Sequence, residues 1–302
     1  MDVVAGSDAK RSRPSGGRRS QGAKRAGANP GKQGQSGLIV PRWETPVSDS
    51  DIRKGDAASV LDFWSAFGRI TKDSVAGPTG SPMSVQPWQR HVIERIYARD
   101  SETGKRKHRR CLIGTARKNG KTGFAAVLGL YGLMAEVNGA EVYSCAADRE
   151  QAKLVFNAAK RIVEMDRELT AATKIYRDAI EFPDGGSVYR ALSSEAFTKE
   201  GLSPTLVIYD ELHAAPDREL YDVMSLAMGA RTEPMMLIVT TAGAKADRFG
   251  KDTICYQLYQ LGKRIANGSP GTGTLGTFNR MLKTGGLTLK DVDFAALSMP
   301  QM

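Results

Sequence analysis

The amino-acid sequence predicts an α/β fold built on a mostly parallel sheet with helices on both faces. Two observations carry this prediction. Between residues 110 and 264, short apolar runs alternate with longer stretches of helical character, in the order strand, helix, strand, helix. The runs "CLIG" and "LVIY" show no polar alternation, which is typical of strands buried on both faces. The content of 41% hydrophobic and 25% charged residues is that of an ordinary soluble protein.

Two helices are predicted ahead of the sheet. The first covers residues 58–70, where apolar side chains recur at helical spacing: Val60, Leu61, Phe63, Trp64 and Phe67. The second covers residues 86–100, with one apolar side: Trp88, Val92, Ile93 and Ile96. A loop rich in Gly and Pro, "AGPTGSP", separates them. A charged turn, "ETGKRKHRR", leads into the alternating region.

The strands of the alternating region are predicted from apolar runs bounded by polar or Gly residues, at 110–116, 140–146, 179–185, 187–192, 205–211 and 235–243. The helices between them are predicted at 120–136, 148–165, 217–229 and 251–264. Asp148 is suited to begin the second of these helices. The run Asp184-Gly185-Gly186 suits the turn of a hairpin between the third and fourth strands.

Composition divides the chain into four segments. Residues 1–37 hold eight Lys/Arg against two Asp and almost no large apolar side chains, which predicts a disordered basic arm. The arm either binds a phosphate backbone through counterion release or is a solvated tail. Residues 38–84 are expected to form an N-terminal helical lobe and residues 85–264 the main domain. Residues 265–302 are rich in Gly and Thr and predict a weakly ordered tail.

Several classes of protein are disfavoured. No apolar stretch approaches the roughly 20 residues that cross a bilayer, and the N-terminus lacks the apolar segment of a secretory signal. The expected location is therefore the cytoplasm, with no membrane partner. The three cysteines and three histidines are scattered, so neither a disulfide framework nor a metal site built from His or Cys is predicted.

The heptapeptide "ARKNGKT" at 116–122 is a candidate phosphate-binding loop. A strand leads in and a helix leads out, and consecutive backbone N–H groups at a helix N-terminus bind phosphate. Lys121 would contact the β- and γ-phosphates and Thr122 would hold Mg²⁺. The pattern GxxxxGK[ST] requires Gly at 115, where this chain has Thr115 with Gly114 before it. Taken alone, the motif is equally compatible with a Gly-Lys-Thr that merely begins a helix.

An acidic pair strengthens the nucleotide interpretation. Asp210 and Glu211 follow the buried run "LVIY", at the end of the strand where ligands bind in open α/β sheets. Asp210 would hold magnesium through water, and Glu211 would orient and deprotonate the attacking water. The alternative is a strand that simply ends in polar residues. We expect Lys121 and this pair to converge across neighbouring strand ends on one metal–triphosphate unit.

A third element is "TTAG" at 240–243, which ends the next strand. Its hydroxyl groups could sense the γ-phosphate and relay its loss. On this evidence alone, an ordinary end of a strand is the simpler interpretation.

In order and spacing, "DFWSAFGRITKDSVAGPTGSPMSVQPWQRHVIERIY", "ARKNGKT", "LVIYDELH" and "GARTEPMMLIVTTAG" resemble the ATPase half of the large terminase subunit of tailed bacteriophages, a DNA-packaging motor. The resemblance runs from about residue 40 to about residue 262. It implies a P-loop NTPase fold of the additional-strand (ASCE) type, with ATP and Mg²⁺ as cofactors. An Arg inside the phosphate loop is expected in that family, so the departure at Thr115 fits it.

The resemblance also implies roles for individual residues. Gln89 of "PWQ" would recognise the adenine edge, although a solvated helix residue is the alternative. Asp210 and Glu211 would be the Walker B pair. The phosphate loop would comprise Arg117, Lys118, Asn119, Gly120, Lys121 and Thr122, and the coupling motif Thr240, Thr241, Ala242 and Gly243.

A motor of this kind acts as a homo-oligomeric ring, in which a neighbour's Arg stabilises charge on the transferring phosphoryl. Arg149 and Arg231 are the candidates, and a surface salt bridge is the alternative for each. The implied partners are double-stranded DNA, the portal protein and the small terminase subunit, in the cytoplasm of the bacterial host.

Large terminases of this type carry a second, nuclease domain that binds two metals. Only 59 residues follow Gly243, which are too few for such a domain, so we expect ATPase activity without nuclease activity. The alternatives are a helicase-like or restriction-associated DNA-dependent ATPase, and a non-catalytic truncated terminase fragment.

Overall fold

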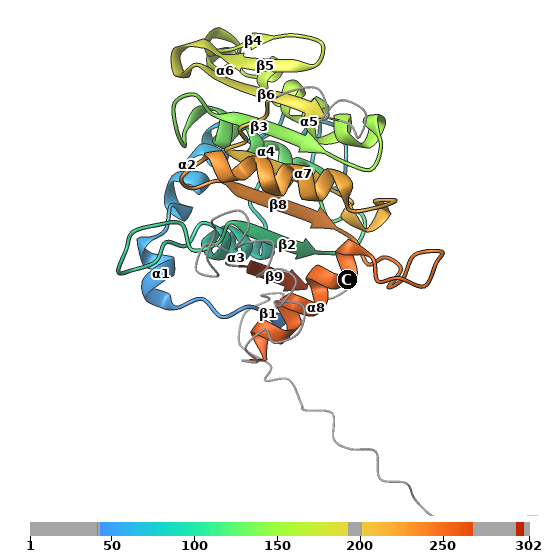
Figure 1. The fold of residues 1–302 in the computed structure, drawn as a ribbon. Coiled ribbons are helices and arrows are strands. Elements are labelled where there is room, and N and C mark those ends of the chain that lie inside the picture. The colour runs from blue at the N-terminus through green and yellow to red at the C-terminus, as the bar shows by residue number, and fades with distance from the viewer. Residues whose placement is uncertain (1–40, 42, 193–200, 268–293, 299–302) are drawn as a thin grey trace, which may run out of the picture. The chain divides into compact units, whose positions relative to one another are not determined.

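A nine-stranded sheet organises the part of the chain that the structure, a computed structural model, describes: residues 41, 43–192, 201–267 and 294–298 (Figure 1). The strand order is β1-β9-β2-β8-β7-β3-β6-β5-β4. The strands are β1 (Trp43–Glu44), β2 (Arg110–Gly114), β3 (Glu141–Cys145), β4 (Lys174–Ile175), β5 (Ala179–Phe182), β6 (Ser187–Leu192), β7 (Leu206–Asp210), β8 (Met235–Thr240) and β9 (Phe294–Ser298).

The centre of the sheet is parallel and its edges are antiparallel. All pairs from β9 through β2, β8, β7 and β3 to β6 are parallel. β1 pairs with β9, β5 with β6 and β4 with β5 in antiparallel register. The predicted hairpin is confirmed: β5 and β6 are joined by the 3₁₀ turn η1 (Pro183–Gly185), followed by Gly186 in the left-handed region at φ 61°. The predicted mostly parallel sheet is confirmed as well.

Eight α-helices and two further 3₁₀ turns occur in the described residues. The helices are α1 (Asp49–Lys54), α2 (Ala57–Phe67), α3 (Pro87–Ile96), α4 (Lys121–Met134), α5 (Arg149–Met165), α6 (Arg167–Ala172), α7 (Glu219–Ala227) and α8 (Ile254–Ala266); the turns are η3 (Leu212–Ala214) and η4 (Met228–Ala230). Asp148 caps α5, as predicted: its side chain accepts a hydrogen bond from the backbone N–H of Gln151 at 2.9 Å. None of the described helices is both long and apolar enough to cross a membrane.

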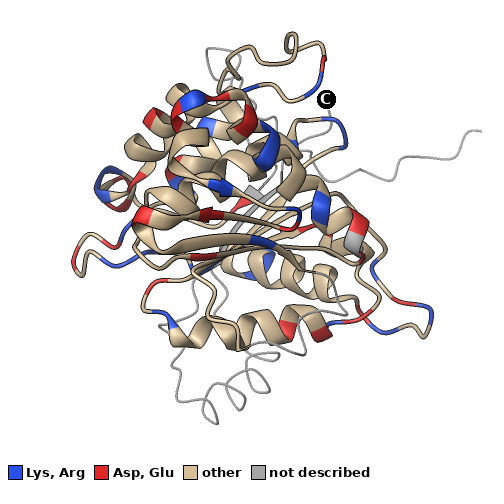
Figure 2. Cartoon of the chain, turned by 90° about the horizontal axis from the view of Figure 1, so that it is seen from above, with Lys and Arg blue, Asp and Glu red and all other residues tan. Residues whose placement is uncertain are grey.

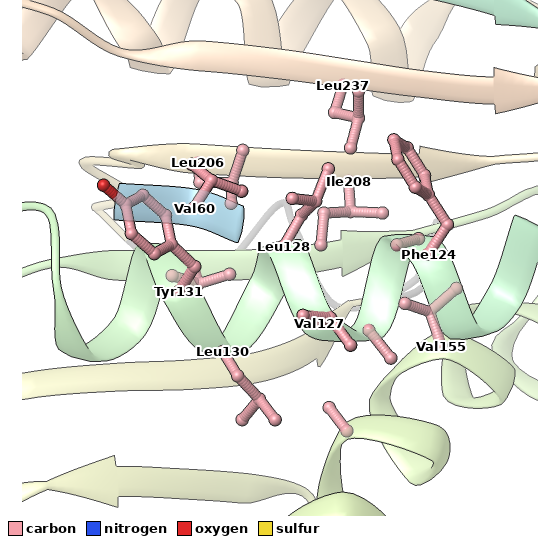
Figure 3. Packing of buried hydrophobic residues seen from close by; sticks show 14 of the residues in the cluster. Val60, Phe124, Val127, Leu128, Leu130, Tyr131, Val155, Leu206, Ile208 and Leu237 are labelled. Carbon is pink, nitrogen blue, oxygen red and sulfur yellow. The ribbon is translucent and has the colours of Figure 1, made fainter. Parts of the chain in front are cut away.

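Two hydrophobic layers, one on each face of the sheet, form the core. The alternation along β7 shows this directly, because Leu206 and Ile208 belong to one layer while Val207 and Tyr209 belong to the other. The first layer is covered by α2, α3, α4 and α5, and the second by α7 and α8. Figure 3 shows the first layer, in which side chains of the central helix α4 lie against β7. The sheet is therefore buried on both faces, as its uniformly apolar strands predicted.

The position of β8 defines the type of fold. β8 is hydrogen-bonded to β2 on one side and to β7 on the other, although it follows both in the sequence. An additional strand thus separates the strand of the phosphate loop from the strand of the acidic pair. This is the additional-strand P-loop fold. The fold type that the family resemblance implied is confirmed, whereas the expectation that the strands of the phosphate loop and of the acidic pair are direct neighbours was wrong.

The segment predicted as a weakly ordered tail contains a strand. β9 pairs in parallel with β2 over five residues, from Arg110 with Phe294 to Gly114 with Ser298. Its short run "FAALS" follows a Gly/Thr-rich stretch and has no flanking pattern that would identify it as a strand. The predicted basic arm at 1–37 lies outside the described residues.

Candidate nucleotide site

The candidate site lies where β2, β7 and β8 end at the carboxyl edge of the sheet. Because these strands are parallel, the segments that follow them meet at one edge. They are the loop 115–120 after β2, Glu211 after β7 and Thr241 after β8. Hydrogen bonds from the backbone N–H of Thr115 to the carbonyl of Thr240, 3.0 Å, and of Glu211 to that of Val239, 2.8 Å, join the three segments.

The phosphate loop turns without a Gly at position 115. Two residues adopt the left-handed region instead, Lys118 at φ 66° and Gly120 at φ 75°. Gly120 directly precedes α4, and the absence of a Cβ makes this conformation readily accessible there. Inside the loop, the amide Nδ2 of Asn119 donates a hydrogen bond to the hydroxyl of Thr115 at 3.1 Å. Thr115, which occupies the position of the Gly in the common motif, therefore stabilises the loop through its hydrogen bond with Asn119.

Lys121 is the first residue of α4, and its ammonium lies 2.9 Å from Oε1 of Glu211. Lys121 is 8% exposed and Glu211 24% exposed, so the ion pair is largely shielded from water. Burial raises the pKa of Glu211, but the hydrogen bond and charge of Lys121 outweigh it, so that the pKa is lowered overall. The expected convergence of Lys121 with the acidic pair is confirmed.

The second oxygen of Glu211 faces the coupling motif. Oε2 accepts hydrogen bonds from the backbone N–H of Thr241 at 3.1 Å and from its hydroxyl at 3.2 Å. Nδ1 of His213 lies 3.0 Å from the same oxygen and 3.1 Å from the hydroxyl of Thr240. Glu211 itself has φ 51°, a left-handed conformation that is costly for a residue with a Cβ. Its two oxygens are thus held toward the phosphate loop and toward β8.

His213 is a residue that the sequence analysis missed. It was counted among three scattered histidines, although it lies only two positions after Glu211 in "DELH". Its backbone N–H also donates to the hydroxyl of Thr240 at 3.3 Å. A Cβ on Gly243 would lie 2.5 Å from Cβ of His213, so the coupling motif needs Gly at this position to accommodate the imidazole. The position of His213, two residues after the acidic pair, was the feature of the sequence that could have identified it as part of the site.

Asp210, the last residue of β7, is 5% exposed. Burial, and secondarily the charge of Glu211, raise its pKa to about 6. Thr122 is the second residue of α4 and is half-buried. These oxygen ligands are of the type that Mg²⁺ prefers. No group of three or more His, Cys, Asp or Glu suited to a metal occurs among the described residues.

Gln89 is buried beside the loop rather than solvated. It is 4% exposed, and its Oε1 accepts a hydrogen bond from the backbone N–H of Gln86 at 2.8 Å, as part of a capping box at the start of α3. Its Nε2 lies 3.8 Å from the position that a Cβ on Gly120 would occupy. Arg117 and Lys118 are exposed and form no ion pair with a described residue.

The structure does not bring Arg231 to this edge. Its guanidinium donates to the carbonyls of Ser203 at 2.8 Å and Gly139 at 2.9 Å, and lies 3.4 Å from Oε1 of Glu141. These partners precede or begin β7 and β3, so Arg231 joins loops at the amino edge of the sheet. Arg149 begins α5 after the carboxyl end of β3, at the same edge as the phosphate loop.

This combination of a phosphate loop, an acidic pair and an intervening strand agrees with the comparisons with known proteins. The family described as the terminase large subunit, ATPase domain, matches residues 87–264, more than half of the chain. The chain belongs to this family. The large terminase subunit of Enterobacteria phage HK97 is 33% identical over 172 residues, which cover 55% of this chain and 33% of that protein.

The crystal structure of the HK97 bacteriophage large terminase superposes on this terminase ATPase chain with a TM-score of 0.58 and 25% identity, over 77% of this chain and 52% of that one. The chain thus spans between a third and about half of the length of these relatives. The matched region contains the phosphate loop, the acidic pair and the coupling motif.

Proposed function

We propose that the chain hydrolyses Mg²⁺-ATP and couples the hydrolysis to translocation of double-stranded DNA into a procapsid, in the cytoplasm of a bacterial host. The observation that carries this proposal is the contact between Lys121 and Glu211, 2.9 Å, across the end of β8. A cation suited to the terminal phosphates and a carboxylate suited to activating water lie within hydrogen-bonding distance of each other there, which supports the proposal.

The contacts of Glu211 suggest separate roles for its two oxygens: Oε1 accepts the proton and Oε2 keeps the carboxylate oriented. The terminal phosphates of ATP compete for Lys121, which releases Oε1 of Glu211 to accept a proton from water. Oε2 keeps its hydrogen bonds from Thr241, so the carboxylate stays oriented while its partner changes. Asp210 and Thr122 would hold Mg²⁺, which when bound neutralises charge that develops on the phosphoryl oxygens.

For adenine, Gln89 offers Nε2 as a hydrogen-bond donor, while its Oε1 accepts from the backbone N–H of Gln86. Nε2 could donate to a ring nitrogen of the base. We therefore propose adenine recognition through Nε2, with the capping box holding the amide in place.

Replacing Glu211 with Gln tests the proposal. We expect kcat for ATP hydrolysis to fall by roughly 10²-fold or more, while ATP still binds. The control is Glu219→Gln, which changes an exposed carboxylate in the first turn of α7 and should leave kcat unchanged. Unchanged hydrolysis by Glu211→Gln would refute the assignment.

The rival functions predict different results in the wild-type chain. A helicase-like or restriction-associated ATPase should be stimulated by DNA without a portal protein, and a non-catalytic fragment should hydrolyse no ATP. Steady-state hydrolysis with and without linear DNA and portal protein separates the three. Stimulation that requires both DNA and portal protein favours the packaging motor.

For the residue acting between ring subunits, we propose Arg149, because it begins a helix at the edge of the phosphate loop. The test mixes Arg149→Ala subunits, which keep an intact site, with Lys121→Ala subunits, which keep Arg149. If Arg149 acts across the interface, the mixture regains activity that neither variant has alone. If the mixture stays as inactive as the variants, Arg149 is not the residue acting in trans.

A further inference from the structure

The loop between β8 and α8, residues 244–253, begins directly after the coupling motif. Only Ala242 and Gly243 separate it from Thr241, whose N–H and hydroxyl bind Glu211. In Figure 1 it is the orange loop that projects beyond the end of β8. It is thus joined by two residues to Thr241, which holds the carboxylate that would change partners during hydrolysis.

The 244–253 loop is folded by its own hydrogen bonds. Oδ1 of Asp247 accepts from the backbone N–H of Phe249 at 2.8 Å and of Lys251 at 2.9 Å. Gly250 takes the left-handed conformation at φ 77°, and Ala246 forms an antiparallel bridge with Asp252. The carboxylate of Asp247 is therefore engaged within the loop, which holds its tip in a defined conformation.

The loop presents an aromatic ring among exposed cations, one of which, Lys245, also has its ammonium 5.9 Å from the ring centre of Tyr256. Phe249 is 79% exposed, and the guanidinium carbon of Arg248 lies 4.7 Å from the centre of its ring. Lys245, Arg248 and Lys251 are exposed, and none of them forms an ion pair with a described residue. Some exposed cations elsewhere do, as in the pairs of Arg218 with Asp222 and of Arg177 with Asp178.

Figure 2 shows that cations and carboxylates are interspersed over the described helices and loops, so the surface as a whole is not a single basic patch. What distinguishes the 244–253 loop is that its exposed cations flank an exposed aromatic ring. Such cations suit a polyanion, and an exposed aromatic ring among them suits the sugar and base edges of a groove.

We propose that the 244–253 loop contacts the duplex DNA that the motor moves, with Arg248 and Lys251 on phosphates and the ring of Phe249 against the groove. The inference rests on the proposed function and adds the contact surface and its link to the site. Because Thr241 stays hydrogen-bonded to Oε2 of Glu211, any shift of this carboxylate when Oε1 exchanges Lys121 for water moves Thr241 with it and is transmitted to the loop through Ala242 and Gly243.

The salt dependence of DNA binding tests the proposal, with the full chain and a short linear duplex of arbitrary sequence. Arg248→Ala combined with Lys251→Ala should reduce the slope of log K against log[salt] by roughly 2, because two phosphate contacts are lost. The matched control, Lys105→Ala with Arg177→Ala, removes two exposed cations elsewhere and should keep the wild-type slope.

A second readout follows the aromatic ring. Phe249→Trp should change its fluorescence when duplex is added, whereas Val75→Trp, at another fully exposed position, should not. Sedimentation of the same variants without DNA reports on assembly. If the loop variant keeps the wild-type slope of log K against log[salt], or changes assembly but not DNA binding, the assignment of this loop to DNA contact is wrong while the proposed function still stands. A wild-type chain that binds no duplex even at low salt overturns the DNA part of the proposed function, and this inference with it.

Discussion

The ammonium of Lys121 lies 2.9 Å from Oε1 of Glu211, so that the cation proposed to bind phosphate and the carboxylate proposed to accept a proton neutralise each other. This contact satisfies two largely buried charges that would otherwise be costly to desolvate. It also makes each residue unavailable for its proposed role until the other is released.

If the ion pair competes with ATP, weakening it should favour nucleotide binding. Glu211→Gln removes the charge and should tighten ATP binding by several-fold, on the scale of about 1 kcal/mol expected for a partly shielded pair. The measurement is the dissociation constant of a fluorescent ATP analogue at fixed Mg²⁺. Weaker binding to Glu211→Gln than to the wild type would contradict competition.

His213 should matter for turnover more than for ATP binding. Removing the imidazole leaves Oε2 of Glu211 with Thr241 alone, so His213→Ala should lower kcat by about tenfold with little change in KM, as the loss of a close polar contact with a charged group predicts. His213→Asn can still donate to the carboxylate and should recover part of the loss. Equal kcat in His213→Ala and the wild type would show that the imidazole only fills space.

His108 should make the fold sensitive to acid. It is 3% exposed, and neither ring nitrogen has a hydrogen-bond partner in the described part of the chain. Burial, and secondarily the charge of Lys107, lower its pKa to about 4 from an ordinary value of 6.5. The resulting stability is present above pH 6.5 and is lost as the pH falls toward 4.

Between pH 7 and pH 5 the loss attributable to His108 is about 2 kcal/mol. The measurement is the free energy of unfolding in denaturant at the two pH values, for the wild type and for His108→Leu. The wild type should lose more stability than the variant by that amount. Equal losses in both proteins would exclude His108 as the source.

Arg231 should stabilise the fold. Arg231→Ala removes hydrogen bonds to two backbone carbonyls and the contact with Glu141, and should lower the free energy of unfolding by about 1–3 kcal/mol. Because Arg231 lies at the amino edge, kcat at saturating ATP should change by less than about tenfold. Loss of turnover in a folded variant would instead support a role in catalysis between subunits.

Much of the site could be predicted because its elements are local in the sequence. The strand, loop and helix around Lys121 and the strand before Asp210 each carry their own apolar pattern. Parallel pairing then requires that the segments after the strands meet at one edge, which led to the correct convergence of Lys121 with Glu211.

What could not be predicted depends on pairing and packing. β1 and β4 have two residues each, too few for any periodic signal, and β9 is recognisable only by its partner β2. Strand order is equally absent from local patterns, so the position of β8 between β2 and β7 was implied only by the family resemblance. Composition alone also could not show that Arg231 lies at the amino edge or that Gln89 is buried.

The insertion of β8 keeps the strand of the phosphate loop and that of the acidic pair two strand spacings apart, roughly 10 Å. The long, flexible side chain of Lys121 spans this separation. Its contact with Glu211 can therefore break without movement of either strand. The spacing is set entirely at the middle of the sheet. Strands at the end of the sheet, such as β4 and β5, can accordingly be lengthened, shortened or given new neighbours without changing the separation between β2 and β7.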